Sequence, residues 1–136
     1  MIDEAALLAF VLVVSGDVSR SPVDSNGPFY TAIWNDFALD ELLGGADSLS
    51  QRWWRLGPDG PRKIVDFRCR SGKRQRKCRF TLTREGEPGQ TKGGVIVPGT
   101  IRCTALFRPT GESGGWQVWR VYEGNDTVTT MRCKAP

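Results

Sequence analysis

The 136-residue chain contains no histidine. Histidine is the commonest general base and the commonest metal ligand in proteins. Its absence excludes most known types of hydrolytic and metal-dependent active site. The four cysteines, at 69, 78, 103 and 133, show none of the short Cys-x₂₋₄-Cys spacings of structural zinc sites. The sequence therefore predicts no metal, no other cofactor and no catalytic residue.

The chain also lacks an apolar run long enough to span a bilayer. Residues 5–14 are uniformly apolar, but they follow the acidic Asp3 and Glu4, whereas a secretory signal begins with positive charge. A short stretch that is apolar all round is typical of a buried helix. The sequence therefore predicts a core helix over 3–15 and no transmembrane segment.

A second helix is predicted over 28–43. Its start has proline at the first helical position, and the glycine pair at 44–45 resembles a helix stop. Between these signals the apolar residues recur at helical spacing. Its carboxylates are expected on the solvent side as ordinary surface groups: Asp36, Asp40 and Glu41.

From residue 51 to about 133 the pattern is that of strands, beginning with 51–56, where Trp53 and Trp54 would face opposite ways. The strongest signal is 64–83, two alternating segments around a polar turn. One antiparallel register aligns three apolar pairs: Cys69 with Cys78, Phe67 with Phe80, and Val65 with Leu82. Because a one-residue slip would invert every side chain, this agreement predicts a β-hairpin.

The later strands are predicted at 100–108, 116–122 and 126–133. The first two are expected to pair with Phe107 opposite Gln117, Ala105 opposite Trp119 and Cys103 opposite Val121, and the third forms an edge strand. The whole chain, 1–136, is thus predicted to be a single α+β domain. Its two N-terminal helices would pack on a curved antiparallel meander sheet of about six strands.

The even cysteine count and the hairpin register predict two disulfides, Cys69–Cys78 and Cys103–Cys133. The alternative is four buried free thiols in a cytosolic protein. Disulfides favour an extracytoplasmic location, periplasmic or secreted, although no signal for export is recognisable.

The element order resembles the nuclear transport factor two-like and cystatin-like cone fold. The resemblance rests on the apolar helix closing at 15–17, on the strand pairs, and on the next-to-last strand at 114–120. It implies a helix lying in the concave side of a curved sheet. The family includes isomerases, dehydratases and polyketide cyclases as well as non-catalytic binding and assembly domains, but its enzymes place a histidine–aspartate pair in the cone.

Since this chain has no histidine, the resemblance implies a non-enzymatic module that binds a protein or a small apolar ligand. Self-association through a tryptophan face is one version of it. A histidine-free enzyme of the isomerase or cyclase type is the alternative, and it requires an open cavity with a buried carboxylate. The residues expected to line the ligand cavity are Phe67, Phe80, Phe107, Trp119 and Tyr30.

Charge is distributed unevenly along the chain. Residues 1–50 hold eight acids and one base, whereas the remainder holds 18 bases and seven acids. Such asymmetry predicts either that the acidic half packs beside the basic half or that the basic half faces a polyanion. The polyanion candidates lie in the hairpin, with some directly opposed across its strands: Arg68, Arg70, Lys73, Arg74, Arg76, Lys77 and Arg79.

Several partners fit this basic hairpin. Phosphates would neutralise it, but proteins that bind single-stranded nucleic acid interleave aromatic side chains with such bases, and here Phe67 and Phe80 are expected on the opposite face. No recognition helix or zinc module is present. Nucleic acid is therefore less favoured than an anionic surface, lipid or protein, and a merely solvated face is the remaining interpretation.

Overall fold

The structure is a computed structural model that describes residues 22–44, 48–70, 72, 74–90, 93–111 and 114–136. The helix predicted over 3–15 lies outside the described residues. The described chain forms helices followed by antiparallel strands, so the predicted α+β class is confirmed.

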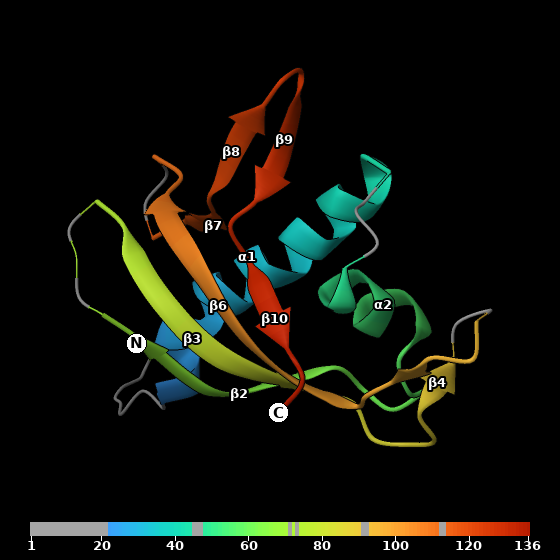
Figure 1. Ribbon diagram of the computed structural model, residues 1–136. Coiled ribbons are helices and arrows are strands. Elements are labelled where there is room, and N and C mark those ends of the chain that lie inside the picture. Colours follow the sequence, from blue (N-terminus) through green and yellow to red (C-terminus); the bar gives the residue numbers. More distant parts are fainter. Residues whose placement is uncertain (1–21, 45–47, 71, 73, 91–92, 112–113) are drawn as a thin grey trace, which may run out of the picture.

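A five-stranded antiparallel sheet forms the framework (Figure 1). Its main path runs β10–β6–β3–β2, and β7 pairs with the other end of β6. The strands of this sheet are β2 (Lys63–Cys69), β3 (Arg76–Thr83), β6 (Thr100–Pro109), β7 (Trp116–Val118) and β10 (Arg132–Lys134). Two small two-stranded sheets flank it: β4 (Gly89–Gln90) with β5 (Ile96–Val97), and β8 (Arg120–Glu123) with β9 (Asp126–Thr129).

Helix α1 (Pro22–Leu42) covers one face of this sheet, which we call the inner face (Figure 1). It includes 28–42 of the helix predicted over 28–43 but begins earlier, at Pro22, a residue suited to the first helical position. Pro28 is accommodated inside the helix.

Helix α2 (Leu49–Leu56) replaces the first predicted strand, so the prediction of a strand over 51–56 is wrong. Ser48 caps the helix by accepting a hydrogen bond from the Gln51 N–H at 3.2 Å. Serine followed three residues later by glutamine is the capping-box pattern. The tryptophan pair therefore lies on a helix rather than on opposite sides of a strand.

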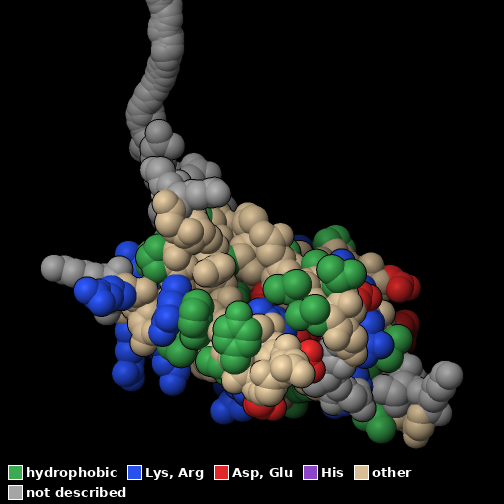
Figure 2. Space-filling model, turned by 90° about the horizontal axis from the view of Figure 1, so that it is seen from above, with side chains coloured by type: hydrophobic (Ala, Val, Ile, Leu, Met, Phe, Trp, Pro, Cys, Tyr) green, Lys and Arg blue, Asp and Glu red, His purple; other side chains and the backbone are tan. Residues whose placement is uncertain are grey.

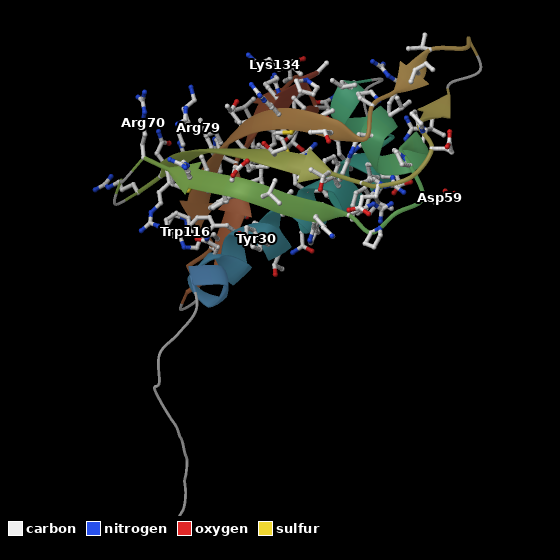
Figure 3. All side chains as sticks on the ribbon, turned by 90° about the horizontal axis from the view of Figure 1, so that it is seen from below. Tyr30, Asp59, Arg70, Arg79, Trp116 and Lys134 are labelled. Atoms are coloured by element: carbon white, nitrogen blue, oxygen red, sulfur yellow. A yellow bond between two sulfur atoms is a disulfide. The ribbon has the colours of Figure 1, made fainter. Side chains whose placement is uncertain are left out.

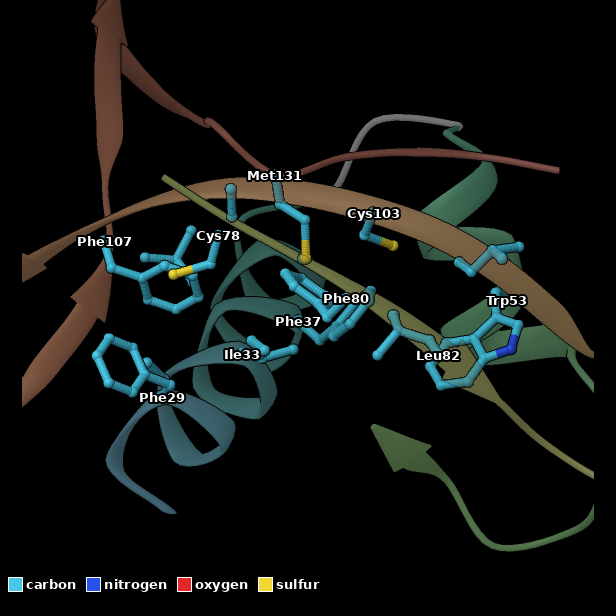
Figure 4. Packing of buried hydrophobic residues seen from close by; sticks show 14 of the residues in the cluster. Phe29, Ile33, Phe37, Trp53, Cys78, Phe80, Leu82, Cys103, Phe107 and Met131 are labelled. Atoms are coloured by element: carbon cyan, nitrogen blue, oxygen red, sulfur yellow. The ribbon is translucent and has the colours of Figure 1, made fainter. Parts of the chain in front are cut away.

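The core lies between the inner face and the two helices (Figure 4). Phe37 of α1 and Trp53 of α2 are fully buried, and Phe29 packs edge-to-face on Phe107 with 5.3 Å between ring centroids. The Trp53 indole N–H donates to the Gly99 carbonyl at 2.9 Å, which ties α2 to the start of β6. The sheet contributes alternate residues to this core: Cys78, Phe80, Leu82, Ile101, Cys103, Ala105 and Phe107.

The β2–β3 hairpin forms as predicted at its turn end, where Cys69 opposes Cys78, but its register changes further along. A β-bulge lies between Val65 and Arg68, and Asp66 within it has a left-handed φ of 55°. The extra residue brings Ile64, instead of Val65, opposite Leu82. The predicted Val65–Leu82 pair is therefore wrong, and Val65 opposes Thr81.

Phe67 lies inside this bulge, so it is not a ladder partner of Phe80. The two rings still meet on the inner face, with 5.9 Å between centroids. The bulge thus turns both Ile64 and Phe67 towards the core, which strict alternation could not do.

The last third of the sheet differs from the prediction in two ways. Phe107 pairs with Val118 rather than with Gln117, which directs the apolar valine into the core. After Trp119 the chain leaves the sheet as the β8–β9 hairpin, so neither Ala105–Trp119 nor Cys103–Val121 is a strand pair.

The final predicted strand is consequently divided into β9 and β10. The Thr130 hydroxyl sits at the break and donates to the Trp119 carbonyl at 2.7 Å. This contact holds the chain where it returns from the projecting hairpin to the edge of β6 (Figure 1).

Both predicted disulfides are present, Cys69–Cys78 on the hairpin and Cys103–Cys133 between β6 and β10. They close loops of very different length, with sequence separations of 9 and 30 residues. Because the entropy removed from the unfolded chain grows with loop length, the second bond is expected to stabilise the fold more than the first.

Removing each disulfide tests this difference. The chain-entropy relation gives a loss of about 2.7 kcal/mol for Cys69→Ser with Cys78→Ser, and about 3.7 kcal/mol for Cys103→Ser with Cys133→Ser. Urea unfolding of the two double variants measures both losses. A larger loss for the Cys69–Cys78 bond would contradict the loop-length argument.

Candidate polyanion-binding face

Seven basic side chains gather on the sheet face opposite α1, and we call this set the outer basic face. Figure 3 shows Arg70, Arg79 and Lys134 on this side and Tyr30 and Trp116 on the other. In the view from above, Lys and Arg side chains project from the lower left margin (Figure 2). Every member is exposed: Arg68, Arg70, Lys77, Arg79, Arg102, Arg132 and Lys134.

The positions of the cysteines explain why these bases share a face. Cys78 and Cys103 are 1% and 3% exposed on the inner face, and each is bonded to a cysteine on the neighbouring strand. Successive side chains of a strand point to opposite faces, so the residues on either side of each cysteine must point outward. The flanking sequences are Arg-Cys-Arg, Lys-Cys-Arg, Arg-Cys-Thr and Arg-Cys-Lys.

The strand register arranges the bases in rows across the sheet. One row runs from Arg68 through Arg79 and Thr104 to Arg132, and the next runs from Thr81 through Arg102 to Lys134. The bases therefore form two groups, one on β2–β3 and one on β6–β10. The hydroxyl side chains of Thr81 and Thr104 lie between them.

A groove of about 780 Å³ spans both groups. A second hollow of about 500 Å³ continues it towards the hairpin turn and shares Arg68, Arg79 and Thr104 with it. Cavities of this size accommodate small or short ligands. The outward side chains along the larger groove are Arg68, Arg79, Arg102, Arg132, Lys134, Thr81, Thr104 and Asp66.

Charge on this face is not neutralised by the described part of the protein. Within the described residues, ion pairs to Asp or Glu are made by Lys63 and Arg120, and by none of the seven bases. Asp66 is the one acid that lines the groove. The Arg132 guanidinium donates to main-chain carbonyls, including that of Met131 at 3.0 Å, which restrains it without cancelling its charge.

The other predicted polyanion candidates are placed differently. Arg76 lies on the inner side, with its guanidinium 4.7 Å from the Trp116 ring centroid, so it is not part of the outer basic face. Arg74 is exposed at the hairpin turn, and Lys73 lies outside the described residues.

Three bases of the outer basic face are absent from the candidates that sequence reasoning selected: Arg102, Arg132 and Lys134. All three lie on β6 and β10, outside the hairpin where the bases are dense along the sequence. The predicted Cys103–Cys133 disulfide is the sequence signal that indicates them. It places Arg102, Arg132 and Lys134, which flank these two cysteines, on the same face as the residues that flank Cys69 and Cys78.

The aromatic ligand-cavity candidates are engaged with one another and with α1. Phe80 and Phe107 are buried, and Phe67 packs on Phe29 and Tyr30 with centroids 5.4 and 5.5 Å away. Trp119 is separate from this group and lies beneath the Arg108 guanidinium at 3.8 Å. Their role as the lining of a ligand cavity stays a prediction.

Asp36 is buried at 4% exposure, so its predicted place among the surface carboxylates is wrong. Arg120 donates to Asp36 Oδ1 and Asp40 Oδ1, both at 2.8 Å, and the Thr129 hydroxyl donates to Asp36 Oδ2 at 2.6 Å. Burial raises the pKa of Asp36, while the hydrogen bonds from Thr129 and Arg120 oppose that shift. This network docks the β8–β9 hairpin on α1 and occupies both carboxylate oxygens.

Breaking this network tests its structural role. Arg120→Met would leave Asp36 buried and unpaired, a change that costs about 3–5 kcal/mol. Adding Asp36→Leu removes the uncompensated charge, so the double variant is expected to recover most of the stability. Chemical unfolding of the wild type, the two single variants and the double variant measures the coupling, and additive losses would count against it.

No protein-family model matches the chain, and no curated protein or solved structure matches it either. In the described residues, no helix is long and apolar enough to cross a membrane. The same part of the chain holds no group of three or more Cys, Asp or Glu side chains arranged to bind a metal ion.

Proposed function

We propose that this protein binds a polyanion through the outer basic face. The observation that supports the proposal is the grouping of seven exposed bases around one groove, where no described Asp or Glu forms an ion pair with them. A surface of one charge sign attracts a chain of the opposite sign and releases its counterions on binding. Two acids of α1, Asp36 and Asp40, pair with Arg120 rather than with these bases. Glu41 accepts a hydrogen bond from the Trp54 indole at 3.1 Å.

The arrangement of the bases also costs stability. Arg68 and Arg79 are direct cross-strand partners, and like charges at such positions repel. A fold selected for stability alone would favour a neutral or oppositely charged pair there. Proteins tolerate such unfavourable pairs of like charges mainly at functional sites. The direct opposition of Arg68 and Arg79 therefore supports a role of this face in binding.

Two other expectations stay predictions. The cone-fold binding module and its self-association through a tryptophan face stay predictions; the five tryptophans are all buried or half-buried. Two disulfides are typical of proteins in oxidising compartments, and we propose a periplasmic or secreted location. Alkylation followed by mass measurement of protein isolated without reductant checks this, since blocked cysteines are expected.

Arg79→Glu is predicted to move stability and binding in opposite directions. The new carboxylate faces Arg68 across the strands, so the free energy of unfolding should rise by about 0.5 kcal/mol at low salt. Affinity for heparin, used as a general polyanion probe, should fall by about tenfold. Urea unfolding and calorimetric titration measure the two effects, and unchanged heparin affinity would contradict the proposed function.

Asp66→Asn is predicted to strengthen polyanion binding. Asparagine tolerates the left-handed backbone of the bulge as well as aspartate does, so the change removes one negative charge from the groove at little structural cost. Affinity for heparin should rise severalfold and should fall more steeply with added salt. Weaker binding by a variant of unchanged thermal stability would show that the groove is not the binding surface.

A further inference from the structure

We infer that the polyanion is a linear sulfated polysaccharide that crosses the strands and bridges the two groups of bases. This inference rests on the proposed function and adds the chemical class and the orientation of the ligand. The two groups are defined by strand: Arg68, Arg70, Lys77 and Arg79 on β2–β3, and Arg102, Arg132 and Lys134 on β6–β10.

The groove offers no aromatic platform. Phe80 borders it, but the Phe80 side chain is buried and its ring packs against Phe67 on the inner face. Trp119 is not among the groove-lining residues, and the Arg108 guanidinium covers one face of its ring. Proteins that bind single-stranded nucleic acid without sequence preference stack bases on aromatic rings between their cations, and this groove has the cations without exposed aromatic rings.

The shape of the face argues against a nucleic-acid duplex. Proteins read duplex DNA by inserting a helix or a β-ribbon into its grooves. Here the bases line a recess on a sheet, together with Thr81 and Thr104. A recess of about 780 Å³ accepts a short length of a single slender chain, not the side of a double helix.

The side chains match the groups of a sulfated sugar. Five of the seven bases are arginines, whose planar guanidinium forms paired hydrogen bonds with oxyanions of the sulfate and phosphate type. The threonine hydroxyls between the groups can both donate to and accept from sugar hydroxyls. Clusters of Lys and Arg of this density are typical of heparin-binding patches as well as of nucleic-acid sites.

The strand order gives the direction of the ligand. Neighbouring strands lie about 4.8 Å apart, so the three spacings from β2 to β10 cover about 14 Å. A chain lying across the strands contacts Arg68 and Arg79 at one end and Arg132 at the other, because these residues share one cross-strand row. A chain lying along the strands would contact only one group.

Calorimetric titration of the full chain at physiological salt tests the ligand class. The probes are size-fractionated heparin oligosaccharides, oligothymidylates of matched charge number, duplex DNA and phosphatidylglycerol vesicles. We expect the longer heparin oligosaccharides to bind about tenfold more tightly than matched oligothymidylate or duplex. Affinity should rise steeply once the oligosaccharide is long enough to span about 14 Å.

A pair of double variants tests the location. Arg79→Glu with Arg102→Glu alters one base in each group, and Arg55→Glu with Lys63→Glu makes the same change in net charge away from the groove. Heparin affinity should fall by about a hundredfold in the first and by less than about threefold in the second. Equal losses would overturn the assignment to this face.

The outcomes separate the inference from the proposed function. Equal affinity for heparin, oligothymidylate and duplex, lost in the groove variant, would overturn the sulfated-polysaccharide assignment and leave polyanion binding in place. Preference for vesicles would overturn it in favour of a membrane surface. Binding of the shortest oligosaccharide as tightly as the longest would overturn the bridging orientation. An absence of binding to every probe would overturn both proposals.

Discussion

The two disulfides on the inner face of the sheet determine that the basic residues flanking the cysteines lie on the outer face. Cys69–Cys78 and Cys103–Cys133 both lie on the inner side. Strand alternation then sends the neighbours of all four cysteines outward, and seven of those eight neighbours are Lys or Arg. A one-residue slip would expose the core and bury the bases together, so the packing that stabilises the fold also holds the charges in place.

The arginines of this protein serve two different purposes. Several arginines outside the outer basic face have structural contacts: Arg84 donates to the Trp53 carbonyl at 2.8 Å, and the Arg76 guanidinium lies against the Trp116 ring. Arg120 likewise joins α1 to the β8–β9 hairpin through Asp36. The bases of the outer basic face have no comparable protein partner among the described carboxylates. Because the positive charges of the outer basic face form no ion pair with these carboxylates, they are available to bind an anionic ligand.

Alternation and cysteine pairing were sufficient to predict the hairpin and both disulfides from the sequence, and helical spacing ahead of the strands was sufficient to predict the α+β class. The prediction failed where a local signal outweighed the simple pattern. Trp53-Trp54 suggested a strand, although Ser48 and Gln51 formed a helix cap just before them. The alternating sequence of this segment gives no indication of the bulge at Asp66. Asp36 is buried because Arg120, 84 residues further along the chain, neutralises its charge. Three of the seven bases of the outer basic face, Arg102, Arg132 and Lys134, were missed because they join the others across strands rather than along the chain.

A folded sheet presents basic side chains to a polyanion in fixed positions, whereas a disordered basic tail does not. The bases on neighbouring strands are held at spacings set by backbone hydrogen bonds, and the disulfides join β2 to β3 and β6 to β10. Much of the entropy lost when a flexible tail becomes ordered on a ligand has therefore been lost already during folding. The same rigidity keeps Arg68 opposite Arg79 despite their repulsion. Removal of that repulsion by an anionic chain contributes directly to binding, so the electrostatic cost within the free protein and its affinity for a polyanion have one physical origin.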